Sequence, residues 1–167
     1  MLNMKVLQTY YLEMRARPDA RIDAAARQYQ LLECLRPQPM LNEFLYRLVG
    51  KAWDWTDRLD WSLEQWRELV ESSAHRTWVA YTEGVVAGYF ELSKQDNDVE
   101  LLYFGLSPEF IGEGIGKLLL EDAVYAAWDW KPAERVWVHT CNLDHPAALA
   151  NYKRRGFVHY KTEEEQL

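Results

Sequence analysis

The sequence predicts an α/β fold, and three observations lead to that prediction. The chain has 167 residues, 49% of them hydrophobic and 14% aromatic, so it is long enough to bury a substantial core within one domain. Strand-like and helix-like runs alternate along it. A glycine-rich loop at 109–116 connects one strand-like run with a long apolar-periodic helix.

The chain before residue 36 is expected to form two strands. The run at 6–14 predicts the first strand, and the run at 28–35 predicts the second. Between them, residues 15–27 are polar and contain Pro18 and an alanine cluster. This segment is therefore expected to be a loop or a short helix.

Two helices are expected next. The first covers 40–49, after a proline-rich break at 37–39, and Gly50 is its expected cap. Ser62 is the expected N-cap of the second helix, because Gln65 stands at the position that completes a capping box. The predicted apolar face of the first helix consists of Leu41, Phe44, Leu45 and Leu48.

The second half of the chain reads mainly as strands. Glu83 and Gly84 form the expected turn of a hairpin. The acidic stretch 162–167 could form a short closing strand, but a solvated tail is the favoured expectation. The expected strands are 77–81, 85–92, 99–106, 135–140 and 157–161; a polar turn covers 94–98, and the helices are the one after the glycine loop and 146–155.

The glycine loop carries the strongest functional signal. Gly112, Gly114 and Gly116 let the backbone turn tightly and approach a ligand without Cβ clashes. The helix that begins there presents unpaired N–H groups and the positive end of its dipole. A strand, a glycine loop and a helix in this order predict a site for a phosphate or pyrophosphate.

Two familiar phosphate-binding motifs do not match this spacing. A P-loop has four residues between its first glycine and the Gly-Lys pair, followed by Ser or Thr. Here three residues separate Gly112 from Gly116, and Leu118 follows Lys117. A dinucleotide fingerprint places its third glycine where this chain has Lys117. Either another phosphorylated ligand binds here, or the loop is a plain turn before a helix.

A second motif lies near the C-terminal end, where 145–157 reads as a helix closed by a glycine and followed by a strand. Together, the two motifs resemble those of the GNAT superfamily of acyl-CoA-dependent N-acetyltransferases, over roughly 76–161. Ile111, Glu113 and His145 depart from the family pattern, which has an amide or basic residue, a basic residue and Asn there. The matching residues are Gly114 and Gly116 in the first motif and Ala148, Tyr152, Gly156 and Phe157 in the second.

The resemblance implies a fold and a cofactor. The fold is the GNAT fold, with a central mixed, mostly antiparallel sheet flanked by helices and an extra N-terminal strand. We expect a single domain over 1–167, with an N-terminal extension at 1–27 and a core at 28–161. The acyl donor is expected to be acetyl-CoA. Its expected contacts are Phe104, Leu106, Ile111, Gly112, Glu113, Gly114, Ile115, Gly116, Lys117 and His145, with the oxyanion contact supplied by a backbone N–H near Phe104 to Leu106.

Acetyl transfer to an amine needs a proton acceptor and a proton donor. Glu100 is the first candidate for the base, because a carboxylate on a strand face with Leu102, Phe104 and Leu106 would have a raised pKa. The alternative for Glu100 is a solvated strand edge, with Glu91 on the neighbouring strand in reserve.

Tyr152 is the candidate donor to the departing thiolate, a role the resemblance implies. The alternative for Tyr152 is simple core packing. His139 is either a proton relay or a structural histidine, and the structural role is the favoured one. Cys141 could act as a nucleophile in a ping-pong route, although the sequence supplies no activating group for it.

The acceptor site is the least readable part of the sequence. Tryptophans alternate with aspartates at 51–61, where the first two helices of the family meet. They could hold an aromatic or cationic amine through cation–π and charge contacts. The favoured alternative is that most of the indoles pack in the core while the aspartates face water.

The charge and composition of the chain limit the kinds of partner that it is expected to bind. A net charge of −7 and a pI near 5.1 argue against nucleic acid or an anionic membrane as a partner. Cys34 and Cys141 form no metal pattern, and neither a signal-peptide core nor a membrane-length apolar run is seen, so a cytoplasmic location is expected.

The predicted function is transfer of an acetyl group from acetyl-CoA to a primary amine of a small molecule or peptide, in a ternary complex. The alternatives are a non-catalytic acyl-CoA-binding sensor and a structural protein that binds nothing. A homodimer is left open, and no metal is expected.

Overall fold

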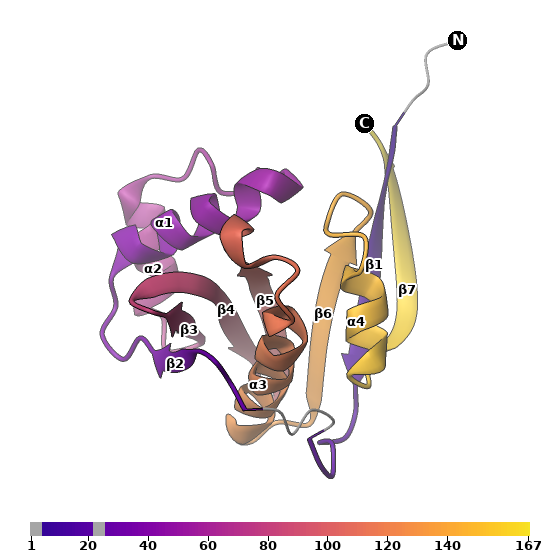
Figure 1. Ribbon diagram of the computed structural model, residues 1–167. Helices are drawn as coiled ribbons and strands as arrows, with labels where there is room; N and C mark the ends of the chain where they lie inside the picture. The colour runs from indigo at the N-terminus through magenta and orange to yellow at the C-terminus, as the bar shows by residue number, and fades with distance from the viewer. Residues whose placement is uncertain (1–4, 22–25) are drawn as a thin grey trace.

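One sheet of seven strands organises the described part of the chain, residues 5–21 and 26–167, in this computed structural model (Figure 1). The strand order is β2–β3–β4–β5–β6–β1–β7, and only β5 and β6 pair in parallel. The sheet is therefore mixed and mostly antiparallel, as predicted. The strands are β1 (Val6–Met14), β2 (Gln30–Glu33), β3 (His75–Thr82), β4 (Val85–Gln95), β5 (Asp98–Leu106), β6 (Arg135–Cys141) and β7 (Val158–Gln166).

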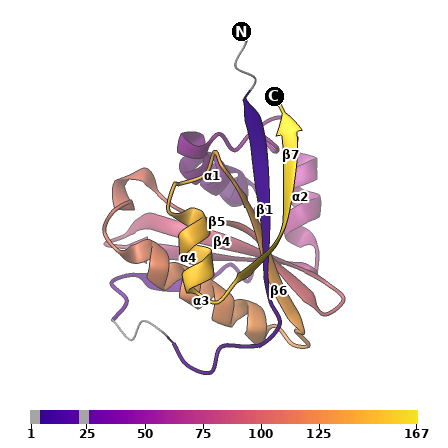
Figure 2. The same cartoon turned by 90° about the vertical axis from the view of Figure 1, so that its right-hand side faces the viewer.

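Helices cover both faces of the sheet (Figures 1 and 2). One face carries α1 and α2, which pack on β5 and β3, and the other face carries α3 and α4. Each face has its own apolar core, the larger one beneath α3 and the smaller one beneath α1. The helices are α1 (Pro39–Gly50), α2 (Leu63–Glu71), α3 (Ile115–Asp129) and α4 (Ala148–Arg154), with 3₁₀ turns η1 (Lys51–Trp53) and η2 (Pro108–Phe110).

The start of α2 confirms its predicted capping box. The backbone N–H of Gln65 donates to the Ser62 hydroxyl at 3.2 Å, and the Gln65 side chain accepts from the backbone N–H of Ser62 at 2.8 Å. The cap predicted at Gly50 is wrong, because α1 runs directly into η1 and Gly50 keeps a helical φ of −78°. Gly50 serves close packing instead, since a Cβ there would lie 2.6 Å from atoms of Trp55.

The predicted apolar face of α1 is only partly right. Leu45 is buried as expected, but Phe44 is 51% exposed. Asn42 lies on the buried side in its place, because its amide donates to Glu91 beneath the helix. The buried face of α1 therefore includes a polar residue that a pattern of hydrophobicity alone does not predict.

A β-bulge interrupts β5. Leu101 pairs with Leu92 and Tyr103 pairs with Glu91, so Leu102 is an extra residue on this strand. The alternation of faces therefore reverses at Leu102. Phe104 and Leu106 pack in the core beneath α3, as Val99 and Leu101 do. The expectation that Glu100 shares a face with Phe104 and Leu106 is wrong, since Glu100 lies on the α1 side with Tyr103.

The parallel pairing of β5 with β6 is short. It covers three residue pairs and ends at Glu100, which is opposite Trp137. Beyond this point the strands diverge, and 101–106 on β5 no longer pairs with β6. The sheet therefore opens between its two central strands.

The strand at 6–14 forms with its predicted bounds and lies inside the sheet. It pairs antiparallel with β6 on one side and with β7 on the other (Figures 1 and 2). The solvated tail predicted at 162–167 is wrong, because 162–166 continues β7 and pairs with 6–10 on β1. Its side chains are exposed, as the charge suggested, but its backbone belongs to the sheet.

The remaining predicted elements form with small changes at their ends. The hairpin turns at Glu83 and Gly84, both of which have positive φ. Of the polar segment predicted at 15–27 as a loop or short helix, 15–21 contains no helix, and residues 22–25 lie outside the described residues.

Candidate active site

A cavity of about 1030 Å³ lies where β5 and β6 diverge. Its walls come from β1, the segment after α1, β5, the glycine loop, β6 and α4. Because the gap runs through the sheet, groups from both faces reach the same space. The cavity therefore joins the glycine loop to the tryptophan-rich segment, two regions that are far apart in the sequence.

The glycine loop forms one end of the cavity. Gly112 and Gly114 have φ angles of 89° and 80°, which strongly favour glycine, and both line the cavity. Gly114 is the N-cap of α3, and among the described residues no side chain caps the helix there. The N–H groups of the first turn are therefore free to bind an anion, and Lys117 in that turn adds a positive charge.

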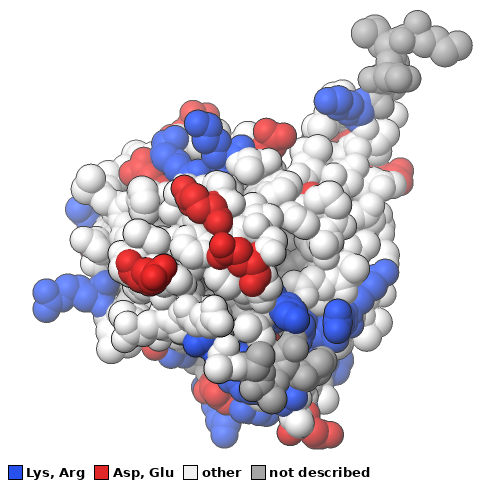
Figure 3. Space-filling model, in the orientation of Figure 1, with Lys and Arg blue, Asp and Glu red and all other residues white. Residues whose placement is uncertain are grey.

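The other predicted cofactor contacts divide into two groups. Phe104, Leu106, Ile111, Gly116 and His145 line the cavity, as Gly112, Gly114 and Lys117 do. Glu113 is exposed outside the lining, and the Ile115 side chain is buried in the core beneath α3. Figure 3 shows acidic side chains at the centre of this face, where Figure 1 draws the loop between β5 and α3.

Tyr152 lies on α4 and lines the cavity. Its ring contacts Phe104 and Phe157 edge-on, with centroids 6.5 and 5.8 Å away. Within the described residues, its hydroxyl makes no hydrogen bond. Burial raises the pKa of this phenol above its usual value, and the charge of Asp144 acts in the same direction. Tyr152 therefore presents a protonated hydroxyl to the cavity.

Glu100 lies at the point where β5 and β6 part. Its side chain is 17% exposed, and within the described residues its carboxylate accepts no hydrogen bond. Burial raises the pKa of Glu100 to about 7, and the more distant Arg58 only partly opposes the shift. This confirms the expectation of a raised pKa, although the surrounding face is not the predicted one.

Glu91, the reserve candidate for the base, is buried away from the cavity. Its carboxylate accepts from Asn42 at 2.9 Å, contacts His75 at 2.8 Å and pairs with Arg58 at 3.1 Å. Burial alone would raise the pKa of Glu91, but His75 and Arg58 lower it below its usual value. The Glu91 carboxylate therefore forms a structural ion pair and is not placed to act as the base.

His139 and Cys141 both line the cavity from β6. The imidazole Nε2 of His139 lies 3.7 Å from the Glu100 carboxylate, and burial lowers the pKa of this histidine. Burial raises the pKa of the Cys141 thiol, which disfavours the thiolate that a ping-pong route needs.

The residues of the tryptophan-rich segment divide between packing and the cavity lining. Trp61 packs against Trp66 and the Arg58 guanidinium, as the core alternative predicted. Trp53 and Trp55 line the cavity instead, together with Asp54, Thr56 and Asp57.

Two contacts join this segment to the β6–α4 loop across the cavity. The Trp55 indole N–H donates to Asp144 at 3.3 Å, and Trp53 meets the His145 ring edge-on at 5.2 Å. These contacts connect the tryptophan-rich segment to the β6–α4 loop, which also lines the cavity.

Sequence reasoning missed the contribution of β1 to this site. Thr9 and Tyr11 line the cavity, and so does Asp144. The position of β1 between β6 and β7 depends on long-range pairing, which no local pattern reports. The turn at Asp144 did carry a signal, since its carboxylate accepts from the backbone N–H of Cys141 at 3.1 Å.

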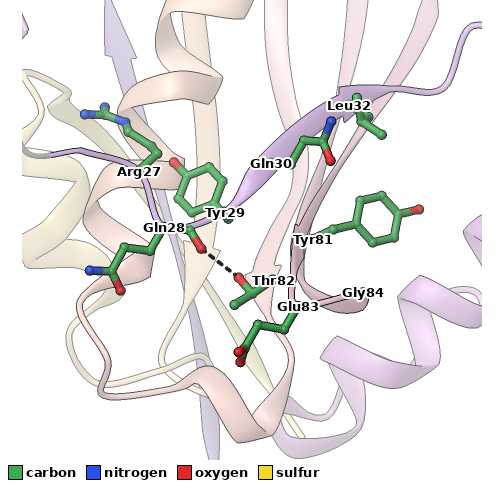
Figure 4. Close-up of a pocket in the computed structure, with 9 residues that line it drawn as sticks. All are labelled: Arg27, Gln28, Tyr29, Gln30, Leu32, Tyr81, Thr82, Glu83 and Gly84. Carbon is green, nitrogen blue, oxygen red and sulfur yellow. Dashed lines mark hydrogen bonds between the residues drawn. The ribbon is translucent and has the colours of Figure 1, made fainter.

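A second hollow, of about 600 Å³, lies at the β2 edge of the sheet (Figure 4). It lies between the start of β2 and the β3–β4 hairpin, where the Thr82 hydroxyl donates to the carbonyl of Gln28 at 3.3 Å. None of the predicted site residues lines it.

Among the described residues, no cluster of His, Cys, Asp and Glu is arranged to hold a metal ion. No helix in the same part of the chain has the length and apolarity needed to cross a membrane.

The cavity brings the glycine loop and the start of α3 together with Tyr152 of α4 and the tryptophan-rich segment. The family model "Acetyltransferase (GNAT) family" matches residues 31–157, which is most of the chain. The chain belongs to the GNAT acetyltransferase family, whose members generally use acetyl-CoA as the acyl donor. No curated protein matches it.

Solved structures show the same fold. A conserved protein of unknown function from Staphylococcus epidermidis has a TM-score of 0.56 and 20% identity, over 98% of this chain and 62% of that one. A GCN5-related N-acetyltransferase from Kribbella flavida has a TM-score of 0.65 and 16% identity, over 93% and 55% of the two chains. This chain thus spans between half and two thirds of the length of these proteins.

A third similar structure is closer in length. It is an aminoglycoside acetyltransferase from an uncultured soil metagenomic sample, in complex with trehalose, with a TM-score of 0.63 and 17% identity over 77% of this chain and 88% of that one. At these identities the likeness concerns the fold.

Proposed function

We propose that this protein transfers an acetyl group from acetyl-CoA to a primary amine, by direct attack of the amine on the thioester. One observation carries the proposal: the start of α3, Tyr152 and His139 line a single cavity, and the Glu100 carboxylate lies 3.7 Å from His139 just outside that lining. These groups supply phosphate binding, a proton donor and a proton acceptor, which are the needs of this reaction.

The donor would bind along the opening of the sheet. The first-turn N–H groups of α3 and the Lys117 ammonium would hold the phosphates. Within the described part of the chain, the segment 101–106 has no strand partner on its β6 side, so backbone N–H groups there are available to the thioester carbonyl. A backbone N–H group that already points at the thioester carbonyl stabilises the negative charge that develops on the carbonyl oxygen during the reaction.

The reaction would then need three proton movements. An alkylamine with a pKa near ~10.4 is mostly protonated at neutral pH, so a base must remove one proton before attack. The amine nitrogen forms a bond to the carbonyl carbon and then loses a second proton to solvent, and the carbon–sulfur bond breaks. The Tyr152 hydroxyl donates its proton to the departing thiolate and is reprotonated from solvent.

The acceptor would be a cationic amine. Three carboxylates line the acceptor part of the cavity, those of Asp54, Asp57 and Asp144, and they alternate with the indoles of Trp53 and Trp55. Carboxylates and aromatic faces both attract ammonium groups. A non-catalytic acyl-CoA sensor is the alternative, but it would have no use for a buried carboxylate whose pKa lies near 7.

Calorimetric titration tests the donor site first. Acetyl-CoA is expected to bind in the micromolar range, and ATP is expected to bind much more weakly. Lys117→Gln should weaken acetyl-CoA binding, whereas Lys153→Gln should not, because Lys153 is exposed on α4 outside the cavity. A folded sample that binds no CoA species would contradict the proposal.

Thiol release with spermine, kanamycin and tryptamine as acceptors tests turnover. We expect faster release with the polycations spermine and kanamycin than with the monocation tryptamine. Binding of acetyl-CoA without release by any amine would favour the sensor.

A further inference from the structure

Glu100 and His139 differ in their access to the cavity. The Glu100 side chain is 17% exposed and does not line the cavity, whereas the His139 side chain is 44% exposed and does. An acceptor amine in the cavity would therefore meet the imidazole before it met the carboxylate. The proposed base is set back behind a group that can itself carry protons.

The backbone explains why these two side chains face each other. Glu100 pairs with Trp137 at the last residue pair before β5 and β6 diverge. His139 lies two residues further along β6 and so projects from the same face as Trp137. The bulge at Leu102 leaves Glu100 on this face while the next apolar residues turn to the other one. Glu100 and His139 therefore lie at the end of the gap between β5 and β6 where the two strands still pair.

Ring contacts hold the imidazole in this place. Tyr11 on β1 lies 5.7 Å from His139 between ring centroids, and Trp137 lies 6.2 Å away. Its Nε2 atom is 3.7 Å from Oε1 of Glu100, which is slightly beyond hydrogen-bond distance. A small rotation of either side chain would close this gap, and Nδ1 would then remain for a ligand.

We infer that His139 accepts the proton of the acceptor ammonium and passes a proton to Glu100, so that the two residues form a relay. This inference rests on the proposed acetyl transfer. The ammonium N–H bond breaks and its electron pair stays on nitrogen, while Nδ1 of His139 gains the proton. The Nε2 proton moves to the Glu100 carboxylate, so the ring remains neutral and the carboxyl becomes neutral. Exchange with solvent at the exposed ring then resets both groups.

The charges around His139 are compatible with a neutral ring that accepts protons. Burial lowers the pKa of His139, and nearby carboxylates oppose this shift. Tyr11, whose ring is tilted against that of His139, has a raised pKa and stays protonated. The acidic groups that face His139 are Glu100 on β5, Asp57 in the segment after α1, Asp144 in the β6–α4 loop and Glu163 on β7.

The test compares wild-type protein with His139→Ala, using whichever amine of spermine, kanamycin and tryptamine turns over fastest. We expect kcat/KM at about pH 7 to fall roughly 100-fold, and acetyl-CoA affinity to stay within twofold. The ratio of wild-type to variant kcat/KM should fall toward one as the pH approaches ~10, because the amine is then deprotonated in solution and needs no base. Added imidazole should restore part of the rate at neutral pH. His159→Ala is the control, because His159 lies on β7 and is exposed outside the cavity.

Other outcomes overturn the inference in distinguishable ways. A loss that is equal at every pH and is not rescued by imidazole would make His139 structural. Unchanged kcat/KM in His139→Ala, with a large loss in Glu100→Gln, would mean that Glu100 acts without the ring. Wild-type protein that binds acetyl-CoA but acetylates no amine would contradict the proposed function itself.

Discussion

Two glutamates on neighbouring strands of this sheet have opposite surroundings. Glu91 on β4 is 1% exposed and contacts three polar side chains, those of Asn42, His75 and Arg58. Glu100 on β5 is also largely buried, yet within the described residues its only polar contact is His139 at 3.7 Å. The pKa of Glu91 is lowered and that of Glu100 is raised to about 7.

The difference shows that partners, rather than burial, decide what a buried carboxylate does. Burial raises the pKa of both groups, and only the hydrogen bonds and charges around Glu91 reverse that shift. A fully partnered carboxylate stays ionised and stabilises one arrangement of α1 and the sheet. A carboxylate without partners can exchange a proton near neutral pH, which suits acid–base catalysis.

The largest expected effect is on the Glu91 side of this comparison. Glu91→Gln leaves Arg58 as a buried charge without its counterion, so the free energy of unfolding should fall by about 3–5 kcal/mol. The melting temperature should fall by on the order of 10 °C, measured by calorimetry at neutral pH. Because the pKa of Glu91 is lowered, its stabilisation is present above the unfolded pKa and is lost as pH falls through the folded one.

A double variant separates the ion pair from general damage. Arg58→Met combined with Glu91→Gln should lose less stability than the sum of the two single changes, because neither charge is then left alone. Additive losses, or a loss below about 1 kcal/mol for Glu91→Gln, would mean that the pair contributes little.

The second effect is on catalysis. Glu100→Gln should lower kcat/KM at neutral pH by about 10²-fold to 10³-fold, which is usual for loss of a general base. The acidic limb of the pH–rate profile should also flatten. Rates of thiol release measured at a series of pH values would show this change. An unaltered acidic limb would assign the base to another group.

The same change should stabilise the protein at high pH. The folded pKa of Glu100 is about 7, above its usual value of 4.5, so stability falls as pH rises through this window. The cost of ionising Glu100 is at most about 3 kcal/mol, and it is fully present above pH ~7. Glu100→Gln should therefore raise the melting temperature at about pH 8, where Glu91→Gln lowers it.

Two tyrosines, Tyr152 and Tyr29, differ in the same way as the two glutamates. The Tyr152 hydroxyl has no hydrogen bond among the described residues, whereas the Tyr29 hydroxyl donates to Asp122. Tyr152→Phe should lower kcat about 10-fold to 100-fold with unchanged acetyl-CoA affinity and stability. Tyr29→Phe should leave kcat unchanged and cost about 1 kcal/mol of stability. Loss of activity in both variants, or in neither, would remove the leaving-group role of Tyr152.

Local patterns predicted much of this molecule. The glycine loop, the capping box at Ser62 and the hairpin at Gly84 each depend on a few neighbouring residues, and each forms as expected. The motif at the C-terminal end likewise placed Tyr152 on a helix that lines the site.

Features that depend on pairing between distant segments could not be read in this way. The bulge at Leu102, which sets the face of Glu100, follows from the register of β4 against β5. The place of β1 within the sheet, and the extension of β7 along it, follow from contacts between the two ends of the chain. Partners decided the roles of Glu91 and Glu100, and the sequence does not show which carboxylate Arg58 reaches.

The smallest effect concerns a third carboxylate, which is fully in water. Glu113 is exposed beside the start of α3 and outside the cavity lining, so its charge should oppose phosphate binding by only ~0.3–1 kcal/mol. Glu113→Gln should tighten acetyl-CoA binding about twofold to fivefold at low salt, and the gain should fade at high salt. Glu109→Gln, another exposed carboxylate of the same loop, is the matched control and should change the affinity less. A gain in affinity that persists at high salt would place Glu113 in direct contact with the acyl donor. Its effect would then depend on a specific contact, as the effects of Glu91 and Glu100 do.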